Sequence, residues 1–135
     1  HSKTKKQGAI RGMHFQYKPF AEMKLIRCLK GKVFDVAVDL RKHSSTYLSW
    51  YAEILSPENA TMFIVPEGCA HGFQVLEPDS ELLYLHTAFY NPEYEGGILY
   101  DDPAVGIEWP MACSEISDRD KQYALINNSF HGIKV

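Results

Sequence analysis

The chain lacks the features that mark nucleic-acid-binding, membrane and secreted proteins. Its 135 residues hold 14 Lys and Arg against 17 Asp and Glu, a formal net charge of −3, so it has no overall cationic field to attract a nucleic acid. No apolar run approaches the roughly 20 residues of a membrane-spanning helix, and His1–Gly8 contains no apolar secretion signal. We expect a protein that binds neither nucleic acid nor membrane.

Cysteine is scarce as well. Cys28, Cys69 and Cys113 are widely spaced and form no Cys-x-x-Cys pair. Isolated thiols of this kind indicate a reducing compartment, and we expect a cytoplasmic protein. By contrast, the chain is rich in hydrophobic residues (45%) and aromatic residues (13%), which suits one globular domain over residues 1–135.

Three segments have the pattern of β-strands. In Val33–Leu40 every even position is large and apolar, while Asp35 and Asp39 fall on the other face, which predicts a sheet with one face on the core. Thr61–Val65 is apolar on both faces and predicts a strand between two packed layers. Leu82–His86 alternates again, with its tyrosine and histidine on one face and two of its leucines on the other.

Turn-forming residues separate the apolar segments at short intervals. They lie at Lys30–Lys32, Ser56–Asn59, Pro66–Gly68, Glu77–Ser80 and Asn91–Pro92. Short strands between frequent turns favour an all-β antiparallel sandwich or jelly roll over a parallel α/β sheet. After Asp101 the chain becomes rich in loops, and Ser117–Asp120 has the composition of the start of a short helix.

Two histidines, His14 and His71, stand among glycines and large apolar residues. This context places an imidazole in or beside the core, where a polar group without a hydrogen-bond partner costs about 1–3 kcal/mol. One interpretation is that both rings are structural and satisfied by neighbouring groups. The other is that they line a cavity for acid–base chemistry together with Lys24, Tyr84 and Asp120.

Four motifs extend over nearly the whole chain. They are Arg-Gly-Met-His-Phe-Gln at 11–16, the segment 31–39, Pro-Glu-Gly-Cys-Ala-His-Gly-Phe at 66–73, and Asp-Asp-Pro at 101–103 followed by Gly-Ile-Glu-Trp-Pro at 106–110. In this order and spacing they resemble the dTDP-4-dehydrorhamnose 3,5-epimerase family. The resemblance implies a cupin-like jelly roll that binds a nucleotide-linked 4-keto-6-deoxy sugar, forms a homodimer and needs neither a metal nor another cofactor.

Members of that family carry a further N-terminal segment, which pairs with the partner subunit and contributes to its nucleotide pocket. This sequence begins just before the Arg-Gly-x-His motif. We therefore expect a domain that is shortened at its N-terminus relative to the family, with fewer contacts to the nucleotide and to a second subunit.

The resemblance assigns proton abstraction to His14. An imidazole suits this step beside a ketone, because its pKa of about 6.5 lies near working pH. Asp120 resembles the carboxylate that orients and supports this base. Two alternatives stay open: His14 could be a core histidine bonded to a backbone carbonyl, and Asp120 could cap a helix, because Ser117 and Asp120 have the spacing of a capping box.

Three further residues complete the expected catalytic cavity. Lys24 resembles the ammonium that stabilises an enolate oxygen; without the motif it would be a solvated lysine at a strand edge. Tyr84 resembles the general acid that protonates the opposite face of the sugar, and its alternative is a core tyrosine with a bonded hydroxyl. His71 resembles a second active-site histidine that supports Lys24 or the sugar.

The nucleotide side of the site has its own candidates. Arg11 and Arg119 are the expected diphosphate contacts, because guanidinium groups match phosphate oxygens. Gln16 joins them or binds the sugar. Tyr90 resembles the aromatic residue on which the base stacks, and its alternative is an interface or core aromatic.

A metal-dependent cupin is the competing enzyme class. Such proteins use a His-x-His cluster, a following Glu and a later His, and here Gln16 stands in place of the second histidine. Glu22, His71 and His86 could still hold Zn or Fe. We nevertheless expect no metal, and interpret the remaining histidines, His86 among them, as structural.

These residues lead to one leading hypothesis and one rival. In the first, the 4-keto group acidifies the hydrogens on carbons 3 and 5 of the sugar, as in conversion of dTDP-4-dehydro-6-deoxyglucose to dTDP-4-dehydrorhamnose. His14 removes a proton, Lys24 holds the enolate, and Tyr84 reprotonates the other face. In the second, the chain is a non-catalytic jelly roll that binds a sugar nucleotide. A competent residue type stands at every proposed position, which favours the enzyme.

Overall fold

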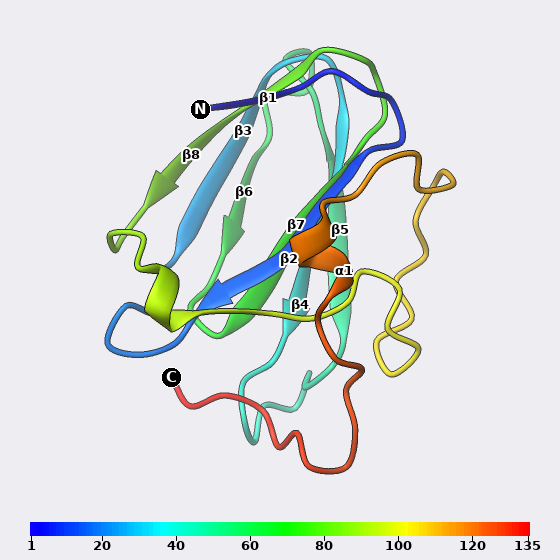
Figure 1. The fold of residues 1–135 in the computed structure, drawn as a ribbon. Helices are drawn as coiled ribbons and strands as arrows, with labels where there is room; N and C mark the ends of the chain where they lie inside the picture. Colours follow the sequence, from blue (N-terminus) through cyan, green and yellow to red (C-terminus); the bar gives the residue numbers. More distant parts are fainter.

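The computed structural model describes residues 1–135, which form antiparallel strands with little helix (Figure 1). The elements are β1 (Ser2–Thr4), β2 (Ile10–Gln16), β3 (Lys24–Lys30), β4 (Val33–Asp39), β5 (Trp50–Leu55), β6 (Met62–Val65), β7 (Cys69–Val75), β8 (Ser80–His86), the 3-10 turn η1 (Pro92–Tyr94), β9 (Glu95–Gly97) and α1 (Asp118–Lys121). The strands form two sheets, ordered β1-β8-β3-β6 and β5-β4-β7-β2-β9. Their arrangement as two facing layers confirms the predicted all-β jelly-roll sandwich with a loop-rich C-terminal segment and a short helix.

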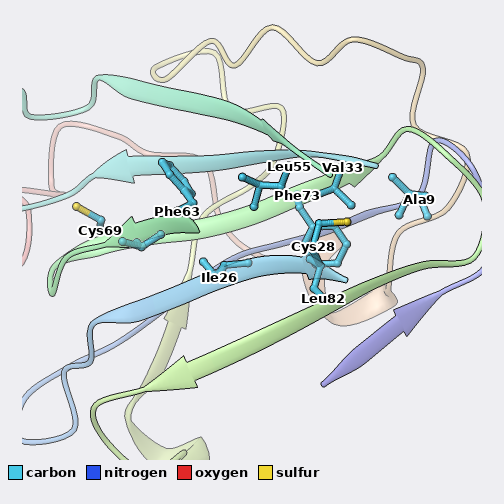
Figure 2. Close-up of a cluster of buried hydrophobic side chains, with 11 residues drawn as sticks. Ala9, Ile26, Cys28, Val33, Leu55, Phe63, Cys69, Phe73 and Leu82 are labelled. Atoms are coloured by element: carbon cyan, nitrogen blue, oxygen red, sulfur yellow. The ribbon is translucent and has the colours of Figure 1, made fainter. Parts of the chain in front are cut away.

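A hydrophobic core fills the space between the two sheets (Figure 2). Its eleven buried residues are Ala9, Ile26, Cys28, Val33, Leu55, Phe63, Val65, Cys69, Phe73, Val75 and Leu82. All but Ala9 come from strands, and these strands belong to both sheets, so the core joins the layers. Removing apolar surface of this extent from water is the main favourable term that holds such a sandwich together.

The second face of the five-stranded sheet is also buried, which corrects the interpretation of Val33–Leu40. The even positions of β4, such as Val36 and Val38, pack beneath the C-terminal segment, where they meet residues such as Ile98 and Ile133. The face that carries Asp35 therefore points between the two sheets instead of toward solvent. A period-two pattern identified the strand correctly, but it could not reveal that a later segment covers the outer face.

The outer face of the four-stranded sheet is uncovered, which corrects the second strand interpretation. Ile64 of β6 and Leu85 of β8 are both paired with Leu25 of β3, so the three side chains form one row across the sheet. Ile64 is 53% exposed and Leu85 is 52% exposed. The strand at 61–65 is therefore an edge strand whose outward apolar side has no covering layer in one copy of the chain.

A β-bulge in β2 sets the direction of the side chains that follow it. Pairing with β7 joins Arg11 to Phe73 but His14 to His71, so the register shifts between the two pairs. In a regular strand, residues three apart point to opposite faces. The bulge instead turns Arg11 and His14 toward the same side, and both line one cavity.

Glycine is required at this bulge. Gly12 has a φ of +122°, and a Cβ at this position would lie 2.6 Å from the Cα of Gly72 on the neighbouring strand. Both the backbone conformation and the close approach of the two strands exclude a larger residue. The conformation next to His14 is thus dictated by two glycines of the sequence.

The single α-helix is only one turn long, and Ser117 caps it by accepting a hydrogen bond from the backbone N–H of Asp120 at 3.1 Å. The helix lies against β2, where the side chain of Asp120 bonds to Gly12 and His14 of that strand. No helix of the structure has the length and apolar character needed to span a bilayer.

Candidate active site

A cavity of about 360 Å³ opens between the two sheets. Its walls include His14 and His71 from the five-stranded sheet and Lys24 and Tyr84 from the four-stranded sheet. Strand pairing explains this convergence. His14 is the cross-strand partner of His71, and Tyr84 of β8 is the partner of Ile26, two residues after Lys24 on β3. The four residues expected to carry the chemistry therefore face one space.

His14 is bonded to a carboxylate from the far end of the chain. Its Nε2 lies 2.7 Å from Oδ1 of Asp120, whose other oxygen accepts a hydrogen bond from the backbone N–H of Gly12 at 3.2 Å. Ser117 supplies the helix cap with its own hydroxyl, so the Asp120 carboxylate does not close the reciprocal half of a capping box. Only the backbone N–H of Asp120 takes part in the cap, and both oxygens of its side chain bond to β2.

The environment of Asp120 determines the tautomer of His14. Burial raises the pKa of Asp120, but the hydrogen bonds from His14 and Gly12 outweigh burial and hold that pKa below its ordinary value. An ionised carboxylate only accepts, so the bond to Asp120 places a hydrogen on Nε2 of His14, a nitrogen that also lies 3.2 Å from Nη2 of Arg119. The lone pair of Nδ1 is then available as a base.

A second histidine–carboxylate pair escaped the sequence analysis. Nε2 of His71 lies 2.7 Å from Oδ1 of Asp35, and both side chains are buried. The other oxygen of Asp35 has no hydrogen-bond partner in the protein. Asp35 was missed because its strand was interpreted as having only one buried face. The available signal was the apolar Val33, which lies two positions earlier on the same face as Asp35.

Lys24 is a buried cation. Its Nζ donates to the backbone carbonyl of His14 at 3.3 Å and lies 3.5 Å from Oε1 of Glu22. Burial lowers the pKa of Lys24, while the Glu22 carboxylate acts in the opposite direction. Glu22 is the carboxylate that forms an ion pair with the ammonium. Lys24 is therefore not the solvated strand-edge lysine considered as the alternative.

Tyr84 lies between two imidazole rings. The ring of His71 meets it edge-on with centroids 5.9 Å apart, and the ring of His86 is stacked on it at 5.8 Å. Burial raises the pKa of Tyr84 far above its ordinary value. The phenol consequently keeps its proton at any ordinary working pH, as a general acid must.

Both arginines expected to contact phosphate are near the cavity and are paired with carboxylates. Nη2 of Arg11 lies 2.5 Å from Oε1 of Glu115. Nη1 of Arg119 lies 2.8 Å from Oε2 of Glu95, and its Nε lies 3.6 Å from Oδ1 of Asp120. Arg119 therefore connects the rim of the cavity with the carboxylate that holds the base. Glu95 also lines the cavity and had not been singled out from the sequence.

Gln16 lines the cavity, but its amide is bonded to the backbone. It donates to the carbonyls of Phe20 and Phe89 and accepts from the N–H of Asn91. These bonds hold the loop that carries Tyr90, whose hydroxyl donates to Glu95 at 3.0 Å.

Two aromatic side chains project from this loop. Tyr90 lines the cavity, and its neighbour Phe89 is 91% exposed.

His86, interpreted as structural from the sequence, lies at the cavity. It lines the mouth of the cavity and its Nδ1 lies 2.8 Å from Oε2 of Glu22. No group of three or more His, Cys, Asp or Glu side chains is arranged so that it could hold a metal ion. Glu22, His71 and His86 therefore do not converge as a ligand set.

Comparison with known proteins shows which family has this sequence and fold. A family model described as dTDP-4-dehydrorhamnose 3,5-epimerase matches residues 1–128. The chain belongs to this family. The dTDP-4-dehydrorhamnose 3,5-epimerase of Shigella flexneri is 48% identical over 120 residues, which make up 89% of this chain and 66% of that protein. The chain thus spans about two thirds of the length of its curated relatives in the epimerase family.

Solved structures of the epimerase family share the fold. The dTDP-6-deoxy-D-glucose-3,5-epimerase of Legionella pneumophila, in complex with dTDP-4-keto-L-rhamnose, superimposes with a TM-score of 0.90 at 37% identity, over 99% of this chain and 72% of that one. A 3′-monoepimerase from Streptomyces bikiniensis, in complex with dTDP-quinovose, has a TM-score of 0.86 at 31% identity, over 92% of this chain and 63% of that one. Relatives that invert one carbon and relatives that invert two therefore share this scaffold.

Proposed function

We propose that the protein is an epimerase that inverts carbon 3, carbon 5 or both of a nucleotide-linked 4-keto-6-deoxy sugar, with dTDP-4-dehydro-6-deoxyglucose as the substrate. The observation that carries the proposal is the pairing of His14 with Asp120 in a cavity that also holds Lys24 and a protonated Tyr84. The names of the relatives support the choice of sugar and nucleotide.

The chemistry begins at the free nitrogen of His14. Nδ1 removes the hydrogen on the carbon beside the 4-keto group, and Asp120 stabilises the imidazolium that forms. The electron pair of the broken C–H bond moves to the keto oxygen, giving an enolate. The ammonium of Lys24 stabilises that oxygen from within a buried site, where such an interaction is stronger than in water.

Inversion needs a second proton from the opposite face. Tyr84 donates its phenolic hydrogen to the carbon as the enolate returns to the ketone. His14 has then gained one proton and Tyr84 has lost one, so exchange with water restores both groups and the reaction has no net proton change. If His14 returned its own proton to the same face, the substrate would be regenerated.

The two arginines beside the cavity are suited to bind the diphosphate of the substrate. We assign Arg11 and Arg119 to its oxygens, because both guanidinium groups already carry a hydrogen-bonded carboxylate that an anionic ligand could replace. Tyr90 offers an exposed aromatic face for the nucleotide base at the same rim. Gln16 contributes by holding the loop of Tyr90 in place.

Incubation with dTDP-4-dehydro-6-deoxyglucose in deuterated water tests this function. We expect NMR to detect deuterium at carbon 3, carbon 5 or both, together with inverted product, and the carbons labelled will identify a mono- or a double epimerase. Binding of the sugar nucleotide without deuterium incorporation would instead establish the rival function of a non-catalytic binding protein. His14→Ala serves as the matched control for proton exchange that the enzyme does not cause.

We also propose that the protein is a cytoplasmic homodimer. The uncovered apolar rows on β3, β6 and β8 provide a self-complementary face for a second copy, and exposed apolar patches of this kind mark interaction sites. All three cysteines are free thiols, which suits a reducing compartment.

A further inference from the structure

One buried carboxylate in the cavity has no part in the chemistry described so far. The side chain of Glu22 is 7% exposed and uses both of its oxygens within the site. Oε1 lies 3.5 Å from Nζ of Lys24, and Oε2 lies 2.8 Å from Nδ1 of His86. A single carboxylate thus joins the group assigned to the enolate oxygen with a ring at the mouth of the cavity.

Strand pairing sets the positions of the two side chains that Glu22 contacts. Lys24 at the start of β3 is the cross-strand partner of His86 at the end of β8, so the two side chains leave neighbouring points of the same sheet. Glu22 stands two residues before Lys24, where the loop from β2 enters β3. From there its carboxylate reaches both side chains, and their separation is set by backbone hydrogen bonds.

His86 extends this connection to Tyr84. The two residues are neighbours on one face of β8, and their rings are stacked with an interplanar angle of 23°. Because Nδ1 of His86 is bonded to Glu22, the ring is held at an angle that keeps it against the phenol. The His86 side chain is 41% exposed, so its ring contacts both the partly buried Tyr84 and solvent.

The charge environment of Lys24 makes Glu22 its dominant partner. Titratable groups face this part of the cavity from the loop before β3, from β2, β4, β7, β8 and β9. They are Glu22, His14, Asp35, His71, Tyr84, His86 and Glu95. Only Glu22 forms an ion pair with Nζ of Lys24, while Asp35 and Glu95 act on it at longer range.

We propose that Glu22 is a positioning residue of the epimerase, which holds Lys24 as an ammonium aimed at the substrate oxygen and holds His86 against the ring of Tyr84. The inference rests on the proposed function. The proposal assigns different functions to different residues. His14 and Asp120 govern proton removal, whereas Glu22 governs the charge that stabilises the enolate and the position of the acid.

Glu22→Gln tests the proposal, because glutamine keeps the size and hydrogen-bonding capacity of glutamate but loses its charge. We expect kcat/KM to fall by about 10- to 100-fold. Loss of the anion lowers the pKa of Lys24, so the alkaline limb of the pH profile should move to lower pH by about one unit. Deuterium incorporation should fall in parallel with turnover, because enolate formation itself is impaired. Glu22→Asp should recover part of the activity.

The matched control is Glu77→Gln. Glu77 forms a surface ion pair with Lys32 at 2.7 Å, outside the cavity. This variant should keep the wild-type rate and pH profile. Melting temperatures of both variants distinguish a local effect from unfolding. His86→Phe keeps an aromatic ring beside Tyr84 but loses the bond to Glu22, and it should lower product formation more than deuterium exchange.

A direct measurement separates this inference from the proposed function. In protein labelled with carbon-13 lysine, the Lys24 resonance, assigned with Lys24→Arg, reports its protonation by NMR in the absence of substrate. We expect its titration midpoint to fall by about one pH unit in Glu22→Gln. An unchanged midpoint overturns the inference even in an active enzyme. A shifted midpoint in a protein that never exchanges deuterium would overturn the epimerase function while leaving the Glu22–Lys24 coupling established.

Discussion

Nε2 of His14 and Oδ1 of Asp120 lie 2.7 Å apart although 106 positions separate the two residues in the chain. The carboxylate reaches the base because a one-turn helix is capped by Ser117 and lies against β2. The orientation of the proposed base therefore depends on a segment that contributes little else to the cavity. Substitution of Asp120 therefore changes the orientation of the His14 ring while the imidazole itself remains.

Asp120→Asn should lower kcat by about 10²- to 10⁴-fold without abolishing exchange. The amide cannot stabilise an imidazolium, and it can present an N–H to Nε2, which favours the wrong tautomer of His14. Steady-state kinetics and deuterium incorporation measure the effect. Asp118→Asn is the matched control, because Asp118 is 94% exposed on the same helix. Equal rates in the two variants would contradict the role of Asp120.

Tyr84→Phe should separate exchange from inversion. The ring remains but the acid is lost, so His14 can still remove a proton and return a deuteron to the same face. We expect product formation to fall by about 100-fold while exchange into the substrate persists. His14→Ala should abolish both processes, because no enolate forms. Normal turnover by Tyr84→Phe, or exchange by His14→Ala, would show that the roles are assigned wrongly.

Activity should be insensitive to chelators. The amide of Gln16, which stands where a metal-binding cupin would have a histidine, is already bonded to three backbone groups, one in the loop after β2 and two in the loop after β8. We expect the same rate before and after dialysis against EDTA, with metal content measured on the same samples. A stoichiometric transition metal whose removal stops the reaction, and whose return restores it, would contradict this expectation.

Leu85→Lys should dissociate the proposed dimer. The substitution places a charge in the row that Leu85 forms with Leu25 and Ile64 on the uncovered face. Sedimentation at tens of micromolar should give a dimer for the wild type and a monomer for this variant. Ile54→Lys is the control, since Ile54 is an exposed apolar residue of β5 in the other sheet. A monomeric wild type would refute the assembly.

Asp39→Asn should destabilise the fold by about 3 kcal/mol at neutral pH. Burial raises the pKa of Asp39, but hydrogen bonds from Arg41, Ser44 and Thr46 outweigh it and hold the pKa well below its usual range. Such a group stabilises the fold above its unfolded pKa of about 3.9 and loses this effect as pH falls. The difference between variant and wild type should therefore shrink below about pH 5 in urea unfolding. Asp101→Asn should behave like the wild type at each pH.

The sequence predicted the strands and the motif residues for good physical reasons. Alternation in Val33–Leu40 and Leu82–His86 is local, and the glycines and apolar residues around His14 indicated a ring in or beside the core. Asp35 could not be found in the same way, because its burial depends on the opposite sheet and on a C-terminal segment that covers the other side of β4.

From the sequence, Glu22 and His86 were considered only as alternative metal ligands, and their contacts with Lys24 and Tyr84 could not be predicted for a related reason. Each has an ordinary local sequence, and only the register of β3 against β8 brings His86 beside Lys24. The bond from Glu22 then depends on the loop that enters β3. Functional groups that a motif contains were therefore predictable, whereas groups that acquire their role through strand pairing needed the structure.

The contact between Gly12 and Gly72 bears on how this scaffold can be altered. A Cβ at either position would collide with the neighbouring strand. The close approach of the two backbones therefore fixes the distance between His14 and His71. Selection for activity on new deoxysugars cannot change this distance in small steps. It must work instead on side chains that line the cavity, such as Tyr90 and Arg11, and libraries randomised at these residues should retain far more active members than libraries randomised at the two glycines.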